Sequence, residues 1–230
     1  MAATQDTANS TGKVEFTVQH LTSKDDLPGY MAVAGKAFRG WRPMSLMNPP
    51  SSTISAEESR AFALEIFSET WSSDPTAHFL VAKLPSGEII GGAKWNFFLT
   101  PEPQFPWPKR YGPTANAEME KWYFEQLDKK RNEAMKGKKH VLMATLVVNP
   151  EYQRCGVGKA LLEWGLKKCD EEGLECWIDA TEEGKGLYLK HGWEEVGKLE
   201  IDLQRWGGGD SEGTMSVANM HRKPRSVDSL

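Results

Sequence analysis

The segment LVVNPEYQRCGVGKALLEWGLKKC, residues 146–169, constrains the fold of this chain more than any other. A nearly continuous apolar run ends at Pro150, and Gly156 and Gly158 then introduce an amphipathic helical pattern. Glycine lets the backbone approach a ligand closely, and the first N–H groups of a helix have no acceptor within the helix. Those donors, the helix dipole and the cation of Arg154 together predict a phosphate-binding site between a strand and a helix.

Two other phosphate-binding motifs fit this segment less well. The loop that binds nucleoside triphosphates needs a serine or threonine where Ala160 stands. A dinucleotide-binding motif would use Gly156 and Gly158, but it needs a third glycine where Leu161 stands. Asp179, which follows Gly158 by 21 residues, has the spacing of the acid that binds the ribose in that motif. A nicotinamide-dependent oxidoreductase therefore stays open as a minor alternative.

Around this segment, hydrophobic periodicity and turn residues predict alternating strands and helices, and hence a mixed α/β fold. Strands are predicted at 14–21, 77–84, 89–99, 141–149, 174–180 and 193–203. Helices are predicted at 25–38, within 51–71, and at 115–136, 156–173 and 184–192. In the second helix, Ser55 and Glu58 have the spacing of a capping box. The insert at 100–113 holds five of the 13 prolines, so it can form neither a helix nor a central strand.

Composition narrows the class of protein. The 28 basic and 32 acidic residues give a net charge of -4, which indicates no nucleic acid and no anionic membrane as a partner. Three cysteines without paired spacing predict neither a disulfide framework nor a zinc site. Because no apolar run could cross a bilayer and the N-terminus has no secretory signal, we expect a cytoplasmic protein. We expect one domain over 14–205, with flexible tails at 1–13 and 206–230.

Two motifs make the chain resemble the GNAT superfamily of acetyl-CoA-dependent N-acetyltransferases. The first is a strand ending in V-x-P and then Q/R-x-x-G-x-G/A, which here reads VNP at 148–150 and QRCGVG at 153–158. The second is L-Y-x-x-x-G-F, which here reads LYLKHGW at 187–193, with Trp193 in place of phenylalanine. The resemblance covers about residues 78–203. Within the family, the chain resembles a fungal branch of enzymes that act on small molecules. It implies a twisted, mostly antiparallel sheet with a splayed parallel strand pair, flanked by helices.

The same resemblance implies how coenzyme A would bind, without a metal. Backbone groups of the strand before the glycine loop would pair with the pantetheine arm. Backbone N–H groups of that loop would hold the pyrophosphate, and residues at the next strand–helix junction would touch the cofactor. The cofactor-binding residues expected on this basis are Leu146, Val147, Val148, Gln153, Arg154, Cys155, Gly156, Val157, Gly158, Lys159, Thr181, Gly184 and Tyr188.

The resemblance also implies a role for Tyr188, which would protonate or steady the departing thiolate of coenzyme A. A phenol and a thiol have pKa values close enough to share a proton. Many family members carry a glutamate base on the strand before the glycine loop, but that strand has no carboxylate here. Asp179, at the end of the next strand, is the best-placed acid. Glu125, His78, His140 and a relay of water molecules remain as other candidates.

Aromatic residues crowd into 95–124, where the family places the pocket for the acceptor. We expect Trp95, Phe97, Trp107 and Tyr111 to contact the acceptor, and the stiff insert to narrow the site. The predicted reaction is direct attack by the primary amine of a small molecule on acetyl-CoA, in a ternary complex on a monomer or homodimer. The missing glutamate motivates a second hypothesis, an inactive sensor or scaffold that only binds coenzyme A.

Overall fold

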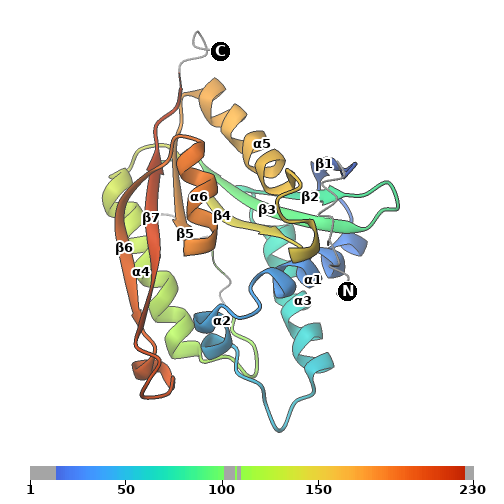
Figure 1. Cartoon of the computed structure of the whole chain (residues 1–230), viewed down its shortest axis with the longest axis vertical. Coiled ribbons are helices and arrows are strands. Elements are labelled where there is room, and N and C mark those ends of the chain that lie inside the picture. The colour runs from blue at the N-terminus through green and yellow to red at the C-terminus, as the bar shows by residue number, and fades with distance from the viewer. Residues whose placement is uncertain (1–13, 101–106, 108–109, 226–230) are drawn as a thin grey trace, which may run out of the picture.

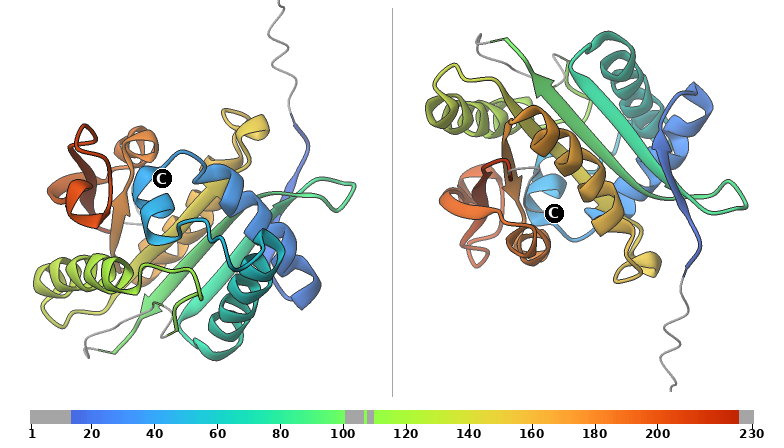
Figure 2. Two further views of the ribbon diagram at one scale, coloured as in Figure 1. Left: turned by 90° about the horizontal axis from the view of Figure 1, so that it is seen from below. Right: turned by 90° about the horizontal axis from the view of Figure 1, so that it is seen from above.

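The computed structural model of the chain describes residues 14–100, 107 and 110–225. One seven-stranded sheet, in the order β1-β2-β3-β4-β5-β7-β6, is covered by helices on both faces (Figure 1, Figure 2). Neighbouring strands are antiparallel except β4 and β5, which run parallel. The predicted fold, a mostly antiparallel sheet with one parallel pair and flanking helices, is confirmed.

Most elements match the sequence-based predictions. The strands are β1 (Thr17–His20), β2 (Ala77–Lys83), β3 (Ile89–Phe98), β4 (His140–Val148), β5 (Glu175–Ala180), β6 (Glu194–Asp202) and β7 (Thr214–Arg222). The helices are α1 (Leu27–Ala37), α2 (Arg42–Met47), α3 (Ala56–Ser73), α4 (Ala117–Met135), α5 (Val157–Glu172) and α6 (Glu182–Lys190). Short 3-10 turns occupy η1 (Lys24–Asp26), η2 (Pro150–Tyr152) and η3 (Gln204–Trp206). The sequence pattern does not predict α2 or β7.

Two consecutive glycines of β3 show which helices cover which face of the sheet. A Cβ on Gly91 would lie 2.7 Å from a methyl of Val157 at the start of α5, and a Cβ on Gly92 would overlap the ring of Tyr30 in α1. Since side chains of consecutive strand residues point to opposite faces, α5 covers one face and α1 the other. Tyr30 stacks on Phe67 of α3, with the ring centroids 5.0 Å apart, so α3 shares the face of α1.

Local signals define the ends of two helices as the sequence predicts. Ser55 and Glu58 form a capping box at the start of α3, with the Ser55 Oγ accepting a hydrogen bond from the Glu58 N–H at 3.1 Å. Helix α5 begins after Gly156, which has a φ of 88°, and ends at Gly173, which has a φ of 66°. Positive φ favours glycine, so these two residues fix where α5 starts and stops.

The predicted flexible tail over 206–230 is wrong for residues 214–222, which form β7. This strand lies between β5 and β6, and its Val217 and Met220 are buried at 1% and 0% exposure. The glycine-rich stretch before it is the connection of a β-hairpin, in which Gly207 and Gly213 both adopt positive φ. The sheet therefore extends the domain beyond the predicted boundary at 205. The predicted tail at 1–13 lies outside the described residues.

Candidate active site

A gap opens between the two parallel strands. The register of β4 and β5 pairs only His140–Leu142 with Glu175–Trp177, and Figure 1 shows the strands running apart beyond those pairs. The Asn149 N–H donates a hydrogen bond to the Ile90 carbonyl of β3 at 2.9 Å. Because backbone groups alternate in direction along a strand, Val147 also faces β3, whereas Leu146 and Val148 turn their N–H and C=O groups to the gap.

The loop after β4 ends beside this gap. Arg154 and Gly156 both adopt positive φ, at 64° and 88°, and the Ala160 N–H donates to the Gly156 carbonyl at 3.0 Å. The N–H groups just before that bond therefore lie at the open start of α5, where an anion is favoured. A Cβ on Gly158 would be 3.4 Å from Val148 and 3.5 Å from Leu187, so the first turn of α5 lies between the end of β4 and α6.

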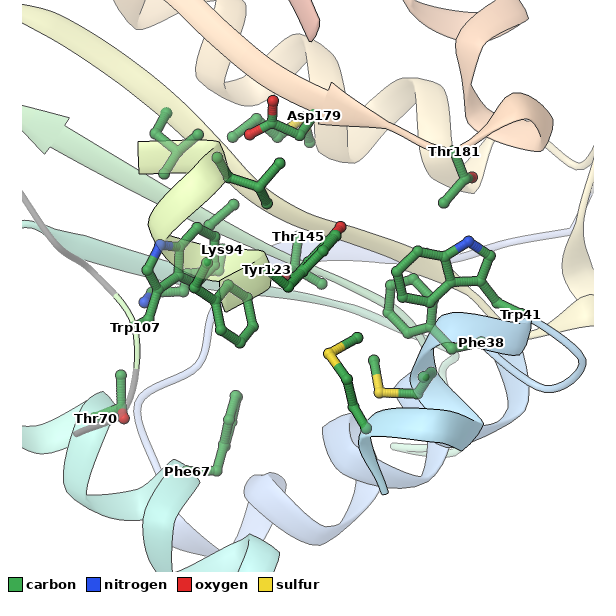
Figure 3. A pocket seen from close by; sticks show the side chains of 17 residues that line it. Phe38, Trp41, Phe67, Thr70, Lys94, Trp107, Tyr123, Thr145, Asp179 and Thr181 are labelled. Carbon is green, nitrogen blue, oxygen red and sulfur yellow. The ribbon is translucent and has the colours of Figure 1, made fainter. Parts of the chain in front are cut away.

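A cavity of about 250 Å³ lies on the face of the sheet opposite α5 (Figure 3). Most of its wall is aromatic or methionine. The lining residues are Phe38, Trp41, Met44, Met47, Phe67, Thr70, Lys94, Trp107, Tyr123, Phe124, Leu127, Leu142, Met143, Ala144, Thr145, Asp179 and Thr181. The register of β3 and β4 shifts between Lys94 and Trp95, leaving Ala144 as the bulged residue. The cavity therefore reaches β4 where the strand leaves β5, at the start of the gap.

Asp179 is the acid on the cavity wall. Its Oδ1 accepts hydrogen bonds from the Trp177 indole at 3.1 Å and from the Asn219 amide at 2.6 Å. Burial raises the pKa of the Asp179 carboxyl to about 6, because the two hydrogen bonds and the charge of Arg131 offset only part of the cost of burying the charged form. A carboxyl with this pKa can accept a proton near neutral pH.

Lys94 brings a cation to the same cavity. The residue is 6% exposed, and its Nζ lies 3.7 Å from Oδ2 of Asp74. Burial lowers the pKa of Lys94 to about 8, and Asp74 opposes this effect only in part. The Asp74 carboxylate also accepts hydrogen bonds from Thr76 and from the Asn96 amide, the latter at 2.8 Å.

Tyr188 lies on the α5 side of the gap, within the main hydrophobic core. It is 5% exposed, and burial raises the pKa of its hydroxyl well above the usual value. A Cβ on Gly184 would be 3.6 Å from the Tyr188 hydroxyl and 3.7 Å from the Thr181 Oγ1. Thr181 also lines the cavity, so it connects the cavity wall to the surroundings of Tyr188.

Three of the four predicted acceptor residues do not line the cavity. Trp95 and Phe97 point to the α5 face, where a Cβ on Gly165 would overlap the Trp95 ring. Tyr111 does not line the cavity. Trp107 does line it, held by a hydrogen bond from its indole to Asp128 at 2.9 Å and by stacking on Phe124. The predictions treated aromatic residues as one group, whereas alternation along β3 sends neighbouring residues to opposite faces.

The other candidate bases do not line the cavity either. His78 packs against Trp164 on the α5 side, His140 is buried against Phe98, and Glu125 is exposed. Lys94 is a site residue that sequence reasoning missed, although a lysine inside the apolar run of β3 is a detectable signal. Tyr123 belongs to the aromatic segment 95–124 but was not among the four named acceptor residues, and Trp41 was missed, because only the packing of α4 and of the segment before α2 brings them to the cavity.

Over the part of the chain that the structure describes, no three histidine, cysteine or acidic side chains lie close enough together to hold a metal ion. None of the described helices combines the length and the apolar character that crossing a bilayer requires.

Known proteins resemble this chain in sequence and in fold. Residues 43–193 match the family model described as the acetyltransferase (GNAT) family. A curated protein from Stachybotrys chartarum, named acetyltransferase, is 33% identical over 79 residues, or 34% of this chain. The match spans only 33% of that relative's length.

Solved structures share the fold at low sequence identity. One, described as histone acetyltransferase HPA2 and related acetyltransferase from Corynebacterium glutamicum, is 18% identical with a TM-score of 0.57, covering 94% of this chain and 99% of that one. Another, a putative phosphinothricin N-acetyltransferase, is 15% identical with a TM-score of 0.53, covering 92% of this chain and 100% of that one.

Proposed function

The chain belongs to the acetyltransferase (GNAT) family, and on that premise we propose that it transfers an acetyl group from acetyl-CoA to the primary amine of a small molecule. The observation that carries the proposal is the gap between β4 and β5, with the open start of α5 beside it and a cavity holding Asp179 at its edge. The cavity volume of about 250 Å³ favours a small acceptor over a protein tail.

The residues around the gap fit coenzyme A. Leu146 and Val148 turn backbone donors and acceptors to the gap, where amides of a pantetheine arm could pair with them. Backbone N–H groups from Arg154 to Lys159 would hold the pyrophosphate, because they lie at the positive end of α5. When bound, acetyl-CoA would supply the acetyl group as a thioester. Val147 faces β3, so we assign the pairing to its two neighbours.

Two side chains would move the protons of the reaction. The amine nitrogen forms a bond to the acetyl carbon, the carbon–sulfur bond breaks, and Asp179 takes the proton that the nitrogen loses. A pKa of about 6 suits this role, because the carboxyl is ionised at neutral pH and still basic enough to accept a proton. Tyr188 would give its hydroxyl proton to the departing sulfur, and its position across Thr181 from the cavity supports this assignment.

The proposal is tested by measuring acetyl-CoA binding by calorimetry and amine-dependent thiol release by a colorimetric assay. The structure offers a matched pair of variants, Gly156→Ala and Gly173→Ala. Both glycines have positive φ at opposite ends of α5 and open space at Cβ, so both variants carry a similar backbone strain of about 1–3 kcal/mol. Only Gly156→Ala should weaken acetyl-CoA binding, by at least tenfold.

Three results would contradict the proposal in different ways. Equal effects of the two variants on acetyl-CoA affinity would remove the assigned phosphate site. Binding of acetyl-CoA without thiol release from any amine would favour a sensor or scaffold. Binding of NAD or NADP without binding of acetyl-CoA would favour an oxidoreductase, with Asp179 as the ribose-binding residue.

A further inference from the structure

We infer that the cavity binds its acceptor as a cation and selects primary amines that carry no charge besides the reacting nitrogen, on a compact apolar body. One carboxylate oxygen of Asp179 and the hydroxyl of Tyr123 hold the ammonium, and the aromatic wall holds the body. This inference rests on the proposed acetyl transfer and names the class of its acceptor.

The carboxylate of Asp179 is held so that one of its two oxygens can receive a ligand. Trp177 and Asn219 both donate to the same atom, Oδ1, at 3.1 Å and 2.6 Å. Among the described residues, none donates a hydrogen bond to Oδ2. The side chain lines the cavity and is only half-buried, so Oδ2 is the oxygen that a ligand can reach. A carboxylate in apolar surroundings favours a cationic donor, because a charge-assisted hydrogen bond offsets the cost of its burial.

The other charges near Asp179 lie in pairs of opposite sign. The guanidinium of Arg131 lies 2.8 Å from Oδ1 of Asp128, and Nζ of Lys94 lies 3.7 Å from Oδ2 of Asp74. Each pair combines one cation with one anion, so it adds little net charge to the surroundings of the cavity. Asp179 is the one acid among the described residues that line it. A cation therefore suits the position beside Asp179, whereas an anion would meet a charge of its own sign.

Tyr123 brings a hydroxyl to the same part of the cavity. Its ring packs edge-on against Trp41, with the ring centroids 6.0 Å apart, and Figure 3 shows the hydroxyl pointing to the side where Asp179 and Thr181 lie. Burial and, second, the charge of Asp179 raise the pKa of Tyr123, so the two groups lie within electrostatic reach of each other. The hydroxyl has no hydrogen-bond partner among the described residues. It can therefore accept a hydrogen bond from an ammonium that Asp179 holds.

Five aromatic rings form a continuous row along the cavity. The order is Phe38, Trp41, Tyr123, Phe124 and Trp107, and neighbouring ring centroids lie 4.5–6.0 Å apart. Ring faces attract a cation, and the same rings bury apolar surface. The volume of about 250 Å³ is small beside the roughly 300–1,000 Å³ of most small-molecule sites. The body of the acceptor is therefore limited to about one ring or one short chain.

Two kinds of amine fit this site poorly. In an α-amino acid, the carboxylate is attached to the carbon that carries the amine, so it would lie next to the carboxylate of Asp179. A diamine would bury its second ammonium against rings and methionines, and the described lining residues offer no second carboxyl there. The site therefore favours a monoamine over both.

The first test measures binding by calorimetry with coenzyme A at saturation, so that no acetyl transfer consumes the amine. The probes are phenethylamine and 2-phenylethanol, which share one body and differ in the charged group. We expect the wild-type protein to bind the amine at least tenfold more tightly, and Asp179→Asn to lose this preference.

A matched pair of variants isolates the hydroxyl of Tyr123. A hydrogen bond to a charged group contributes enough that Tyr123→Phe should weaken phenethylamine binding about tenfold. The same variant should change 2-phenylethanol binding less than threefold. Tyr111→Phe removes a hydroxyl that does not line the cavity, so it should change neither.

The second test compares acceptors that differ by one charge, namely phenethylamine with phenylalanine and pentylamine with 1,5-diaminopentane. The measured quantity is kcat/KM for thiol release at a saturating concentration of acetyl-CoA. We expect the monoamine of each pair to react with at least tenfold higher kcat/KM, because its only charge lies beside Asp179.

Failure of the inference and failure of the proposed function give different results. If phenethylamine binds no more tightly than 2-phenylethanol, or if phenylalanine or the diamine is the better acceptor, the inference is overturned and acetyl transfer stays intact. An unchanged Kd for phenethylamine in Tyr123→Phe would remove the hydroxyl from the ammonium site. If phenethylamine binds as expected but neither it nor any other amine releases thiol, the proposed function fails, and the bound amine is not an acceptor.

Discussion

Replacing Asp179 by asparagine should stabilise the protein while it impairs the reaction. Folding raises the pKa of this carboxyl from an ordinary value of 3.8 to about 6. The folded state therefore holds the proton more tightly than the unfolded chain, so stability falls as the pH rises from about 4 to about 6 and stays lower above that range. At about 1.36 kcal/mol per pKa unit, the penalty near neutral pH is about 3 kcal/mol.

Asparagine removes that penalty because it carries no charge, and its carbonyl oxygen can still accept the hydrogen bonds from Trp177 and Asn219. The gain at pH 7.5 should reach up to about 3 kcal/mol, or roughly 6–12 °C in Tm for a chain of this size. The weaker hydrogen bonds that a neutral amide accepts reduce this gain. At pH 5 the gain should shrink, because much of the wild-type carboxyl is then protonated.

The effect on the reaction should be opposite. Loss of a positioned base lowers the rate by about 10²- to 10⁴-fold. In the wild-type protein, kcat/KM should rise with pH through an apparent pKa of about 6, and the variant should lack this acidic limb. The two assays are urea unfolding at pH 5 and 7.5 and thiol release between pH 5 and 9. A variant less stable than wild type at pH 7.5, or one that keeps the acidic limb, would refute the reasoning.

Four other substitutions test separate parts of the structure. Tyr188→Phe should lower kcat by at least tenfold and leave the Kd for acetyl-CoA within about twofold, because the ring stays in the core; unchanged turnover would remove its role as proton donor. Met220→Ala should cost about 2–5 kcal/mol in urea unfolding, since the side chain is fully buried in β7, whereas a mobile tail would show no change. Gly165→Ala should lower the free energy of unfolding by about 1–3 kcal/mol, because the new Cβ would overlap the indole ring of Trp95 beneath α5. Gly186→Ala should instead raise the free energy of unfolding by about 0.5–1 kcal/mol, because its Cβ would enter open space and alanine favours a helix more than glycine does. A loss of stability in this variant would contradict the geometry of α6.

The sequence by itself determined the features that depend on neighbours in the chain. The capping box at Ser55 and the glycines that start and stop α5 act within one turn of a helix, so their residue types are sufficient to place them. The glycine loop after β4 was predictable for the same reason. Period-two and helical patterns also placed most strands and helices, because each amphipathic element must bury one face.

Only the tertiary structure decided which residues meet. The strand β7 follows a glycine-rich stretch, and it becomes a strand because β5 and β6 both offer it hydrogen-bonding edges. Trp95 and Lys94 are neighbours in sequence, yet the pleat of β3 sends the indole under α5 and the ammonium into the cavity. The alternation of side chains along a strand shows that Lys94 and Trp95 must point to opposite faces of the sheet, but it does not show which of these faces the hydrophobic core will cover. That choice depends on helices folded from distant segments, which is why the cavity, with Lys94 and Asp179 both on its wall, could not be predicted from the chain alone.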